Sequence, residues 1–209
     1  GRSRPGWPGR RRTKTRLTGT EPAMRRRTAL MATASATAAW ALGAQTAPGL
    51  AEQARRGGVL LIRHASTEPG LGDPAGFTLG QCQTQRNLSE AGRAEARAMG
   101  AWFQRHGLQP RAVLSSQWCR CLDTARLALG QAEPWPALNS TFGGQGQPEQ
   151  QLAQLQARLQ ALPAGVLEVW VTHQVIMTAL TQAYPAMAEG FLVDRQGRLL
   201  SRGMMAPDA

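Results

Sequence analysis

The sequence contains few cysteines, and their arrangement does not suit a metal. Only Cys82, Cys119 and Cys121 occur among 209 residues. A structural zinc site needs four ligands, and a Cys-x-Cys pair without a second cluster or a nearby histidine does not supply them. We therefore expect no metal. Cys119 and Cys121 are too close in sequence to pair easily, so in an exported protein one disulfide would join Cys82 to one of them.

Several other features are also missing, and each absence excludes a class of protein. The chain holds no internal repeat and no interior linker, which favours a single domain. The Gly-rich run at 143–147 lacks the lysine and the strand-to-helix setting of a P-loop. Ser115 and Ser116 lack the G-x-S-x-G elbow of serine hydrolases, and we expect them to cap the following helix instead.

The large positive charge belongs to one end of the chain. Residues 1–27 contain ten Arg or Lys and one acid, a net charge of +9, whereas the remaining 182 residues contain fourteen Arg and twelve acids, a net of +2. The main part of the chain is therefore nearly neutral, which argues against nucleic-acid binding. The basic end either binds polyanions or is untranslated or processed sequence, and we favour the second interpretation.

The segment that follows resembles an export signal. Three arginines come after Met24, and an uncharged stretch rich in Ala and Thr then runs from residue 28 to residue 50. Arg26 and Arg27 loosely resemble a twin-arginine signal. We expect residues 1–23 to be an over-extended N-terminus, residues 24–51 to be the export signal, cleaved after Ala44 or Ala51, and residues 52–209 to form one domain.

This organisation predicts a periplasmic or secreted protein. The stretch at 28–50 is too rich in Ala and Thr for a typical membrane anchor, which needs about 20 predominantly apolar residues. We therefore expect no stable membrane span after processing. A retained anchor is the alternative.

The pattern of apolar residues predicts an α/β protein. Short apolar runs at 59–62, 112–116 and 166–173 indicate buried strands, with a further short strand at 134–138 and a hairpin at 190–203. Helices are expected at 89–106, 118–130, 148–162 and 174–184. Strands that alternate with helices favour a largely parallel sheet covered by helices on both faces. The long loop at 65–86 suggests a functional segment.

Three of these strands end at polar residues: Arg63-His64, Ser115-Ser116 followed by Arg120, and Thr172-His173. In an open α/β sheet, ligands bind outside the carboxyl ends of the strands, so these side chains should meet there. Two histidines and two arginines in one pocket form an anion site. Neighbouring cations keep an imidazole neutral and available for attack, and arginine forks suit phosphoryl oxygens.

Four segments together carry a resemblance to a known family. "LIRHASTEPG", "LSEAGRAEA", "LSSQWCRCLDTA" and "VTHQ" resemble, in this order, the motifs of the histidine phosphatase superfamily, in particular its exported branch 1-type members. The resemblance covers about residues 57–183. It implies a three-layer phosphoglycerate mutase-like α/β fold with a mostly parallel central sheet and helices on both faces.

The resemblance also assigns roles to individual residues. It makes His64 the nucleophile that becomes phosphohistidine, and makes His173 a donor to the phosphoryl group. Arg63 and Arg120 would bind the phosphoryl oxygens. Substrate-binding positions are expected at Thr67, Arg86 and Asn87. No cofactor and no metal are implied, because the arginines supply the positive charge.

The leaving-group acid is where the sequence departs from the family. Gln174 follows the second histidine, where many acid phosphatases have an acidic donor, and Asn139 lies nearest to the place of the glutamate of mutase-like members. Either Glu68 or Asp73, in the long loop, then acts as the acid, or the substrate has a leaving group that hardly needs one.

We therefore expect an exported, metal-independent phosphatase that acts on a small phosphorylated substrate or a phosphoprotein. A phosphatase of envelope sugar phosphates, such as lipopolysaccharide-core heptose, is one alternative. A non-catalytic phosphate-binding or interaction module of the same fold is another. A phosphoglycerate mutase fits poorly, because the chain is short and lacks the glutamate.

Overall fold

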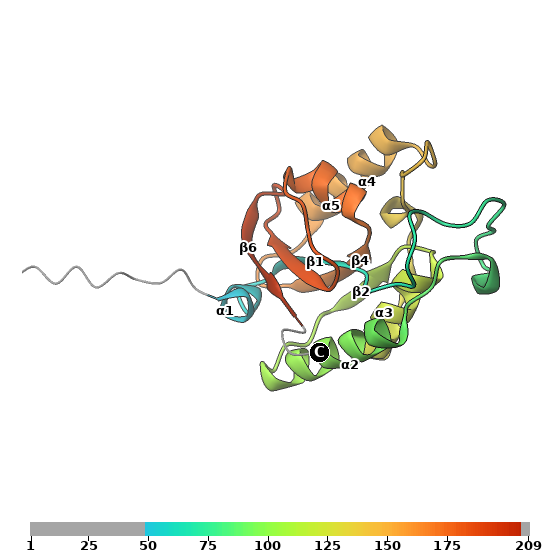
Figure 1. Ribbon diagram of the computed structural model, residues 1–209. Helices are drawn as coiled ribbons and strands as arrows, with labels where there is room; N and C mark the ends of the chain where they lie inside the picture. Colours follow the sequence, from blue (N-terminus) through green and yellow to red (C-terminus); the bar gives the residue numbers. More distant parts are fainter. Residues whose placement is uncertain (1–48, 206–209) are drawn as a thin grey trace, which may run out of the picture. The chain divides into compact units, whose positions relative to one another are not determined.

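Six strands form one mixed sheet in the computed structural model, which describes residues 49–205 (Figure 1). The order across the sheet is β3-β2-β4-β1-β5-β6. Strands β3, β2, β4 and β1 run parallel, and β5 and β6 extend the sheet antiparallel. The predicted α/β fold with a mostly parallel sheet is confirmed. The predicted segments 1–23 and 24–51 lie outside the described residues, apart from residues 49–51, and stay predictions.

The strands are β1 (Gly58–Arg63), β2 (Ala112–Ser115), β3 (Glu133–Pro134), β4 (Leu167–Thr172), β5 (Glu189–Val193) and β6 (Leu199–Met204). The α-helices are α1 (Leu50–Ala54), α2 (Glu90–Arg105), α3 (Cys119–Leu129), α4 (Pro148–Ala161) and α5 (Gln174–Thr181), with 3-10 turns at η1 (Cys82–Thr84) and η2 (Pro136–Leu138). The expected strand at 134–138 is thus mostly a 3-10 turn, since Pro136 begins it. Among residues 49–205, no helix has the length and apolar character needed to cross a membrane.

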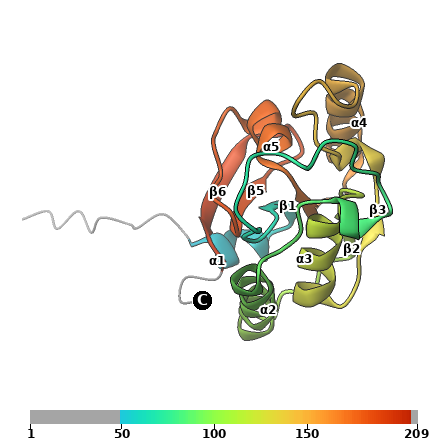
Figure 2. The same cartoon turned by 45° about the vertical axis from the view of Figure 1, so that its right-hand side comes forward.

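Alternate residues of the buried strands pack in two separate hydrophobic cores, one on each face of the sheet. Leu60 and Ile62 of β1 pack in one core with residues of α1, α2 and α3, whereas Val59 and Leu61 pack in the other with residues of α4 and α5. Helices therefore cover both faces of the sheet, as Figure 2 shows for α2 and α3 on one side and α4 and α5 on the other. The period of two along a strand produces this division.

Helix α2 packs closely against the segment that follows β1. The Ser89 hydroxyl caps the helix by accepting the Gly92 N–H at 3.1 Å. A Cβ at Gly92 would lie only 1.8 Å from the Ser66 carbonyl oxygen, so glycine permits this contact. Gly92 and Ala96 lie on the buried face of α2 together with Met99, Trp102 and Phe103.

A disulfide fixes the long loop after β1. It joins Cys82, in η1, to Cys119, at the start of α3, across 37 positions of sequence. This is one of the two pairings that the sequence left open. Cys121 is the free cysteine and is buried, and burial raises the pKa of its thiol to about 12. The loop and the start of α3 are thereby held at the same edge of the sheet.

Candidate active site

The carboxyl ends of two adjacent strands bring the two expected histidines together. His64 directly follows β1 and His173 directly follows β4, and these strands pair in parallel with Arg63 opposite Thr172. The two imidazole ring centres lie 5.4 Å apart, with the rings inclined at 67°. Beside them is a pocket of about 320 Å³. The pocket is lined at its inner end by Arg63, His64, Asp73, Arg86, Arg120 and His173.

His64 is held as a neutral imidazole with one nitrogen available. Its Nδ1 lies 2.9 Å from the Ala65 carbonyl oxygen, which can only accept, so Nδ1 carries the proton and Nε2 keeps its lone pair. Burial lowers the pKa of His64 from 6.5 to about 3, and the charges of Arg120, Arg63 and Arg86 act in the same direction. A buried neutral imidazole beside cations is suited to act as a nucleophile.

The loop after β1 is tied to helix α3 by a threonine. The Ala65 N–H donates to Thr124 Oγ1 at 3.1 Å, and this hydroxyl in turn donates to the Arg120 carbonyl oxygen at 2.7 Å. One side chain therefore links the segment that carries His64 to the helical turn that carries Arg120. This contact gives a physical role to the threonine four residues after the arginine in "RCLDTA".

His173 is buried between polar and aromatic partners. Its Nε2 lies 2.8 Å from Ser116 Oγ, and its Nδ1 lies 3.5 Å from Arg120 Nη2. The edge of the Trp118 indole faces the ring, with the centres 5.3 Å apart. Burial, followed by the charges of His64 and Arg120, lowers the pKa of His173 well below 6.5. His173 is therefore also neutral near pH 7 before an anion binds.

Three arginines give the pocket its positive charge. Arg63 Nη1 donates to the Pro185 carbonyl oxygen at 2.9 Å, and Arg86 Nε donates to the Gly72 carbonyl oxygen at 2.8 Å. Burial and repulsion from Arg120 lower the pKa of both Arg86 and Arg63, although arginine stays charged in proteins. Within residues 49–205, the buried Nε atoms of Arg63 and Arg120 have no hydrogen-bond partner. Such clustered donors favour an anionic ligand.

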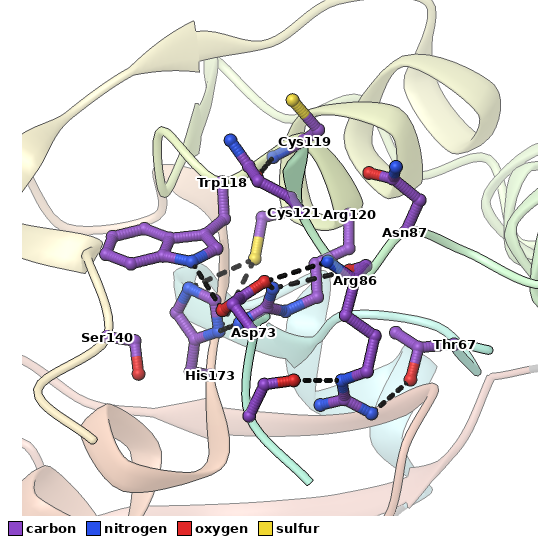
Figure 3. Close-up of polar contacts among 12 residues, drawn as sticks. Thr67, Asp73, Arg86, Asn87, Trp118, Cys119, Arg120, Cys121, Ser140 and His173 are labelled. Carbon is purple, nitrogen blue, oxygen red and sulfur yellow. Dashed lines mark hydrogen bonds and ion pairs between the residues drawn. The ribbon is translucent and has the colours of Figure 1, made fainter. Parts of the chain in front are cut away.

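Asp73 is the one carboxylate among the residues that line this pocket, and it is bound by three donors (Figure 3). Its Oδ1 accepts from Arg120 Nη1 at 2.7 Å and from the Arg86 backbone N–H at 3.0 Å. Its Oδ2 accepts from the Trp118 indole N–H at 2.9 Å. Burial alone would raise the pKa of Asp73, but these hydrogen bonds and the Arg120 charge outweigh it, and the pKa is lowered.

The remaining predicted residues lie outside the pocket lining. Glu68 is exposed. Thr67 Oγ1 accepts from Arg86 Nη1 at 2.5 Å, so it holds an arginine that lines the pocket. Asn87 Nδ2 donates to the Cys82 carbonyl oxygen at 2.6 Å and thus braces the loop. The roles predicted for Glu68, Thr67 and Asn87 at the substrate stay predictions that the geometry does not favour.

Sequence reasoning placed Ser116 at this edge of the sheet but expected it only to cap a helix. The N-cap of helix α3 is Trp118, not Ser116. The Ser116 hydroxyl instead contacts His173 and donates to Asn139 Oδ1 at 3.2 Å. Its place directly after β2, level with the two histidines, was the signal available. The part that Trp118 plays beside His173 was not predicted from the sequence. The outer wall of the pocket, also unforeseen, consists of Leu71, Gly72, Ser140, Phe142, Gln145, Gln174 and Val175.

The side chains around the pocket suit an anion better than a metal ion. Over residues 49–205, no three His, Cys, Asp or Glu side chains are arranged to hold a metal ion. The charged groups that line the pocket are arginines and one aspartate. Their donors suit the oxygens of a phosphoryl group.

The pocket at the carboxyl edge of the α/β sheet thus combines two histidines with three arginines, a set of groups suited to a phosphoryl group. The sequence pattern of the histidine phosphatase superfamily (branch 1) matches residues 59–164, about half of the chain. The chain therefore belongs to the histidine phosphatase superfamily and is an enzyme of this class.

Solved structures share the fold at low sequence identity. A putative alpha-ribazole-5'-P phosphatase from Escherichia coli aligns with a TM-score of 0.52 and 17% identity, over 71% of this chain and 94% of that one. The protein TTHB049 from Thermus thermophilus aligns with a TM-score of 0.50 and 20% identity, over 69% and 97%. The protein histidine phosphatase SixA complexed with tungstate gives a TM-score of 0.49 and 19% identity, over 70% and 96%. A search of curated proteins found no match.

Proposed function

We propose that this protein is an exported, metal-independent phosphatase that hydrolyses phosphomonoesters through a phosphohistidine at His64. One observation carries the proposal: a buried neutral imidazole, with Nδ1 bound to a carbonyl oxygen, lines a pocket together with three guanidinium groups. This combination supplies a nucleophile and binds the charge of the group to be transferred.

In the first step, the Nε2 lone pair of His64 attacks phosphorus. The N–P bond forms while the bond from phosphorus to the leaving oxygen breaks, and that oxygen takes the electron pair. Arg63, Arg86 and Arg120 balance the negative charge on the phosphoryl oxygens. His173 contacts Ser116 through Nε2 and Arg120 through Nδ1. The bound dianion raises the pKa of its imidazole, and protonation of His173 then adds positive charge beside the phosphoryl group.

In the second step, water attacks the phosphohistidine. The P–N bond breaks, its electron pair returns to Nε2 of His64, and inorganic phosphate leaves. The proton of the attacking water passes to solvent or to the phosphate. The imidazole is then neutral again, as burial among the arginines favours.

Asp73 acts in this proposal as a positioning residue. Its carboxylate accepts three N–H donors and stays ionised because its pKa is lowered, so it holds no proton for the leaving oxygen. It fixes the Nη1 side of Arg120 and leaves Nη2 on the side of His173. The proposed enzyme therefore acts best on leaving groups that depart without an acid, and neither Glu68 nor Asp73 is retained as the donor.

Export is supported by the disulfide and by the character of the N-terminal sequence. A disulfide between Cys82 and Cys119 persists in an oxidising compartment such as the periplasm or the extracellular space. The arginine-rich start and the uncharged Ala/Thr stretch before residue 51 are typical of an export signal. A fusion of residues 24–51 to a reporter that is active only outside the cytoplasm would test this part of the proposal.

The activity is tested with p-nitrophenyl phosphate in the presence of EDTA, using the full chain and a His64→Ala variant. Turnover that resists EDTA and disappears in His64→Ala is the expected result. Turnover that survives in His64→Ala would overturn the mechanism. A folded protein that binds vanadate but hydrolyses no phosphate ester would instead indicate the non-catalytic alternative.

A further inference from the structure

The outer wall of the pocket is the part of the site that the chemistry at His64 does not use. It is contributed by three separate segments, namely residues 71–72 after β1, residues 140–145 before α4, and the first turn of α5. None of its side chains is charged. The charged side chains that line the pocket are three arginines and Asp73, which pairs with Arg120. The uncharged outer wall includes the exposed Leu71 and Phe142 and forms the mouth of the pocket, where a second charged group on a substrate would find no charged partner.

Two large apolar side chains are exposed at this mouth. Leu71 is 88% exposed and Phe142 is 47% exposed, and both line the pocket. Exposed apolar side chains that gather at a cavity are typical of ligand-contacting surfaces. The neutral polar side chains beside them are Ser140, Gln145 and Gln174, which suit hydroxyl or amide groups of a ligand.

The Phe142 ring lies beside the loop that carries the phosphoryl-binding groups. A Cβ placed on Gly72 would lie 3.4 Å from Phe142 Cε1, so the ring is a neighbour of Gly72. The Gly72 carbonyl oxygen in turn accepts from Arg86 Nε at 2.8 Å. The Phe142 N–H donates to Ser140 Oγ at 3.2 Å, which turns the chain toward the pocket. Gly72 therefore lies between the Phe142 ring and the guanidinium of Arg86, which lines the pocket.

From this arrangement we infer the class of substrate: a phosphate attached to a single uncharged ring with an apolar face, which packs against Phe142. The inference rests on the proposed phosphatase activity. The pocket volume of about 320 Å³ lies near the lower end of the ~300–1,000 Å³ typical of small-molecule sites, which suits a phosphoryl group and one ring. Aromatic and sugar rings share this chemistry, so the experiment includes both.

The test compares substrates on the full chain. Acetyl phosphate provides a phosphoryl group without a ring, p-carbamoylphenyl phosphate provides a neutral ring, and p-carboxyphenyl phosphate provides a ring of similar size with a charge. Glucose 6-phosphate provides a non-aromatic ring. For the unchanged protein, we expect kcat/KM for the carbamoyl compound to exceed that for the carboxyl compound about tenfold. Glucose 6-phosphate reports whether a sugar ring is accepted as well.

Variants at the mouth give the decisive comparison. Phe142→Ala should lower kcat/KM for p-carbamoylphenyl phosphate about tenfold, as expected for the loss of an aromatic contact, and should change that for acetyl phosphate less than twofold. Phe142→Leu, which keeps apolar area, should give an intermediate value. Tyr184→Ala, at an aromatic that is 70% exposed and lies outside the pocket lining, should change neither substrate.

The two ways of failing are distinct. The inferred substrate class is wrong if Phe142→Ala lowers turnover of acetyl phosphate and p-carbamoylphenyl phosphate equally, or lowers neither. It is also wrong if p-carboxyphenyl phosphate is hydrolysed as well as p-carbamoylphenyl phosphate. The phosphatase activity stands in each of these cases. If the unchanged protein hydrolyses none of these compounds, and no p-nitrophenyl phosphate, in a His64-dependent way, the proposed function itself fails.

Discussion

Asp73 Oδ1 lies 2.7 Å from Arg120 Nη1, and the two side chains are 5% and 4% exposed. The Asp73 carboxylate also binds the Trp118 indole N–H, and both Trp118 and Arg120 contact His173. One aspartate thus holds two of the groups that surround the second histidine. Breaking a buried ion pair leaves an uncompensated charge, so the loss of the Asp73 carboxylate should disturb Arg120 and lower activity.

Asp73→Asn should lower kcat/KM about tenfold, because an asparagine has only one acceptor oxygen and cannot satisfy Arg120, Trp118 and the Arg86 N–H together. If Asp73 acts through Arg120, the same change in an Arg120→Gln background should cost less than twofold. The loss should also be equal for p-nitrophenyl phosphate and phenyl phosphate. A much larger loss for phenyl phosphate, the poorer leaving group, would restore the general-acid role.

The covalent intermediate gives a direct prediction for the two histidines. After rapid quenching with ³²P-labelled substrate, the protein should carry an acid-labile, base-stable label. His64→Ala should abolish the label and the turnover, because it removes the nucleophile. His173→Ala should lower both strongly without abolishing the label. A label of full intensity in His64→Ala would contradict the assignment of the nucleophile.

Protein stability should fall as the pH drops below about 6.5. Burial lowers the pKa of His64 in the folded protein to about 3, whereas the unfolded chain binds a proton near 6.5. Between these values the unfolded state holds more protons, so acidification favours unfolding. His64 alone should reduce the free energy of unfolding by about 2 kcal/mol between pH 7 and pH 5. Urea unfolding at both pH values should show a flatter dependence for His64→Gln, and an unchanged dependence would argue against a neutral buried imidazole.

The disulfide should stabilise the fold and the pocket together, since it ties the Asp73 loop to the helix that carries Arg120. For a loop closed across 37 positions, reduction should cost roughly 2–4 kcal/mol of unfolding free energy. Dithiothreitol should lower both Tm and kcat/KM of the unchanged protein. It should have no effect on the double variant Cys82→Ala, Cys119→Ala, which serves as the matched control. An equal fall in Tm and kcat/KM in that variant would show that dithiothreitol does not act through this disulfide.

Gly92→Ala should destabilise the protein, although replacing glycine by alanine in a helix usually stabilises it. Alanine normally stabilises a helix by about 0.5–1 kcal/mol relative to glycine. Here its Cβ would meet the Ser66 carbonyl oxygen at 1.8 Å, so the helix or the segment after His64 must shift. We expect a loss of about 1–3 kcal/mol in unfolding free energy and a lower kcat/KM. A gain in Tm would show that α2 does not contact this segment as described.

Much of the fold could be predicted from local patterns. The apolar runs predict β1, β2 and β4, and the apolar pattern between them predicts the main helices. These signals depend on residues that are close in sequence. The strand expected at 134–138 is reduced to β3 at Glu133–Pro134, since Pro136 fixes φ and begins a 3-10 turn. The close approach of Gly92 to Ser66 was not predicted, because a glycine carries no hydrophobic signal.

The sequence alone was enough to predict that His64, His173, Arg63 and Arg120 come together, since they lie at or shortly after the ends of apolar strands, and parallel strands present such ends at one edge. Arg86, in the long loop, was expected only from the family resemblance. The sequence left open which cysteine pairs with Cys82, and it could not assign Asp73. Only the tertiary structure brought Asp73 against Arg120 and Phe142 against Gly72, since these contacts join segments 47 and 70 positions apart. Contacts of this kind depend on how loops cross the sheet edge, and no local pattern of residues encodes that path.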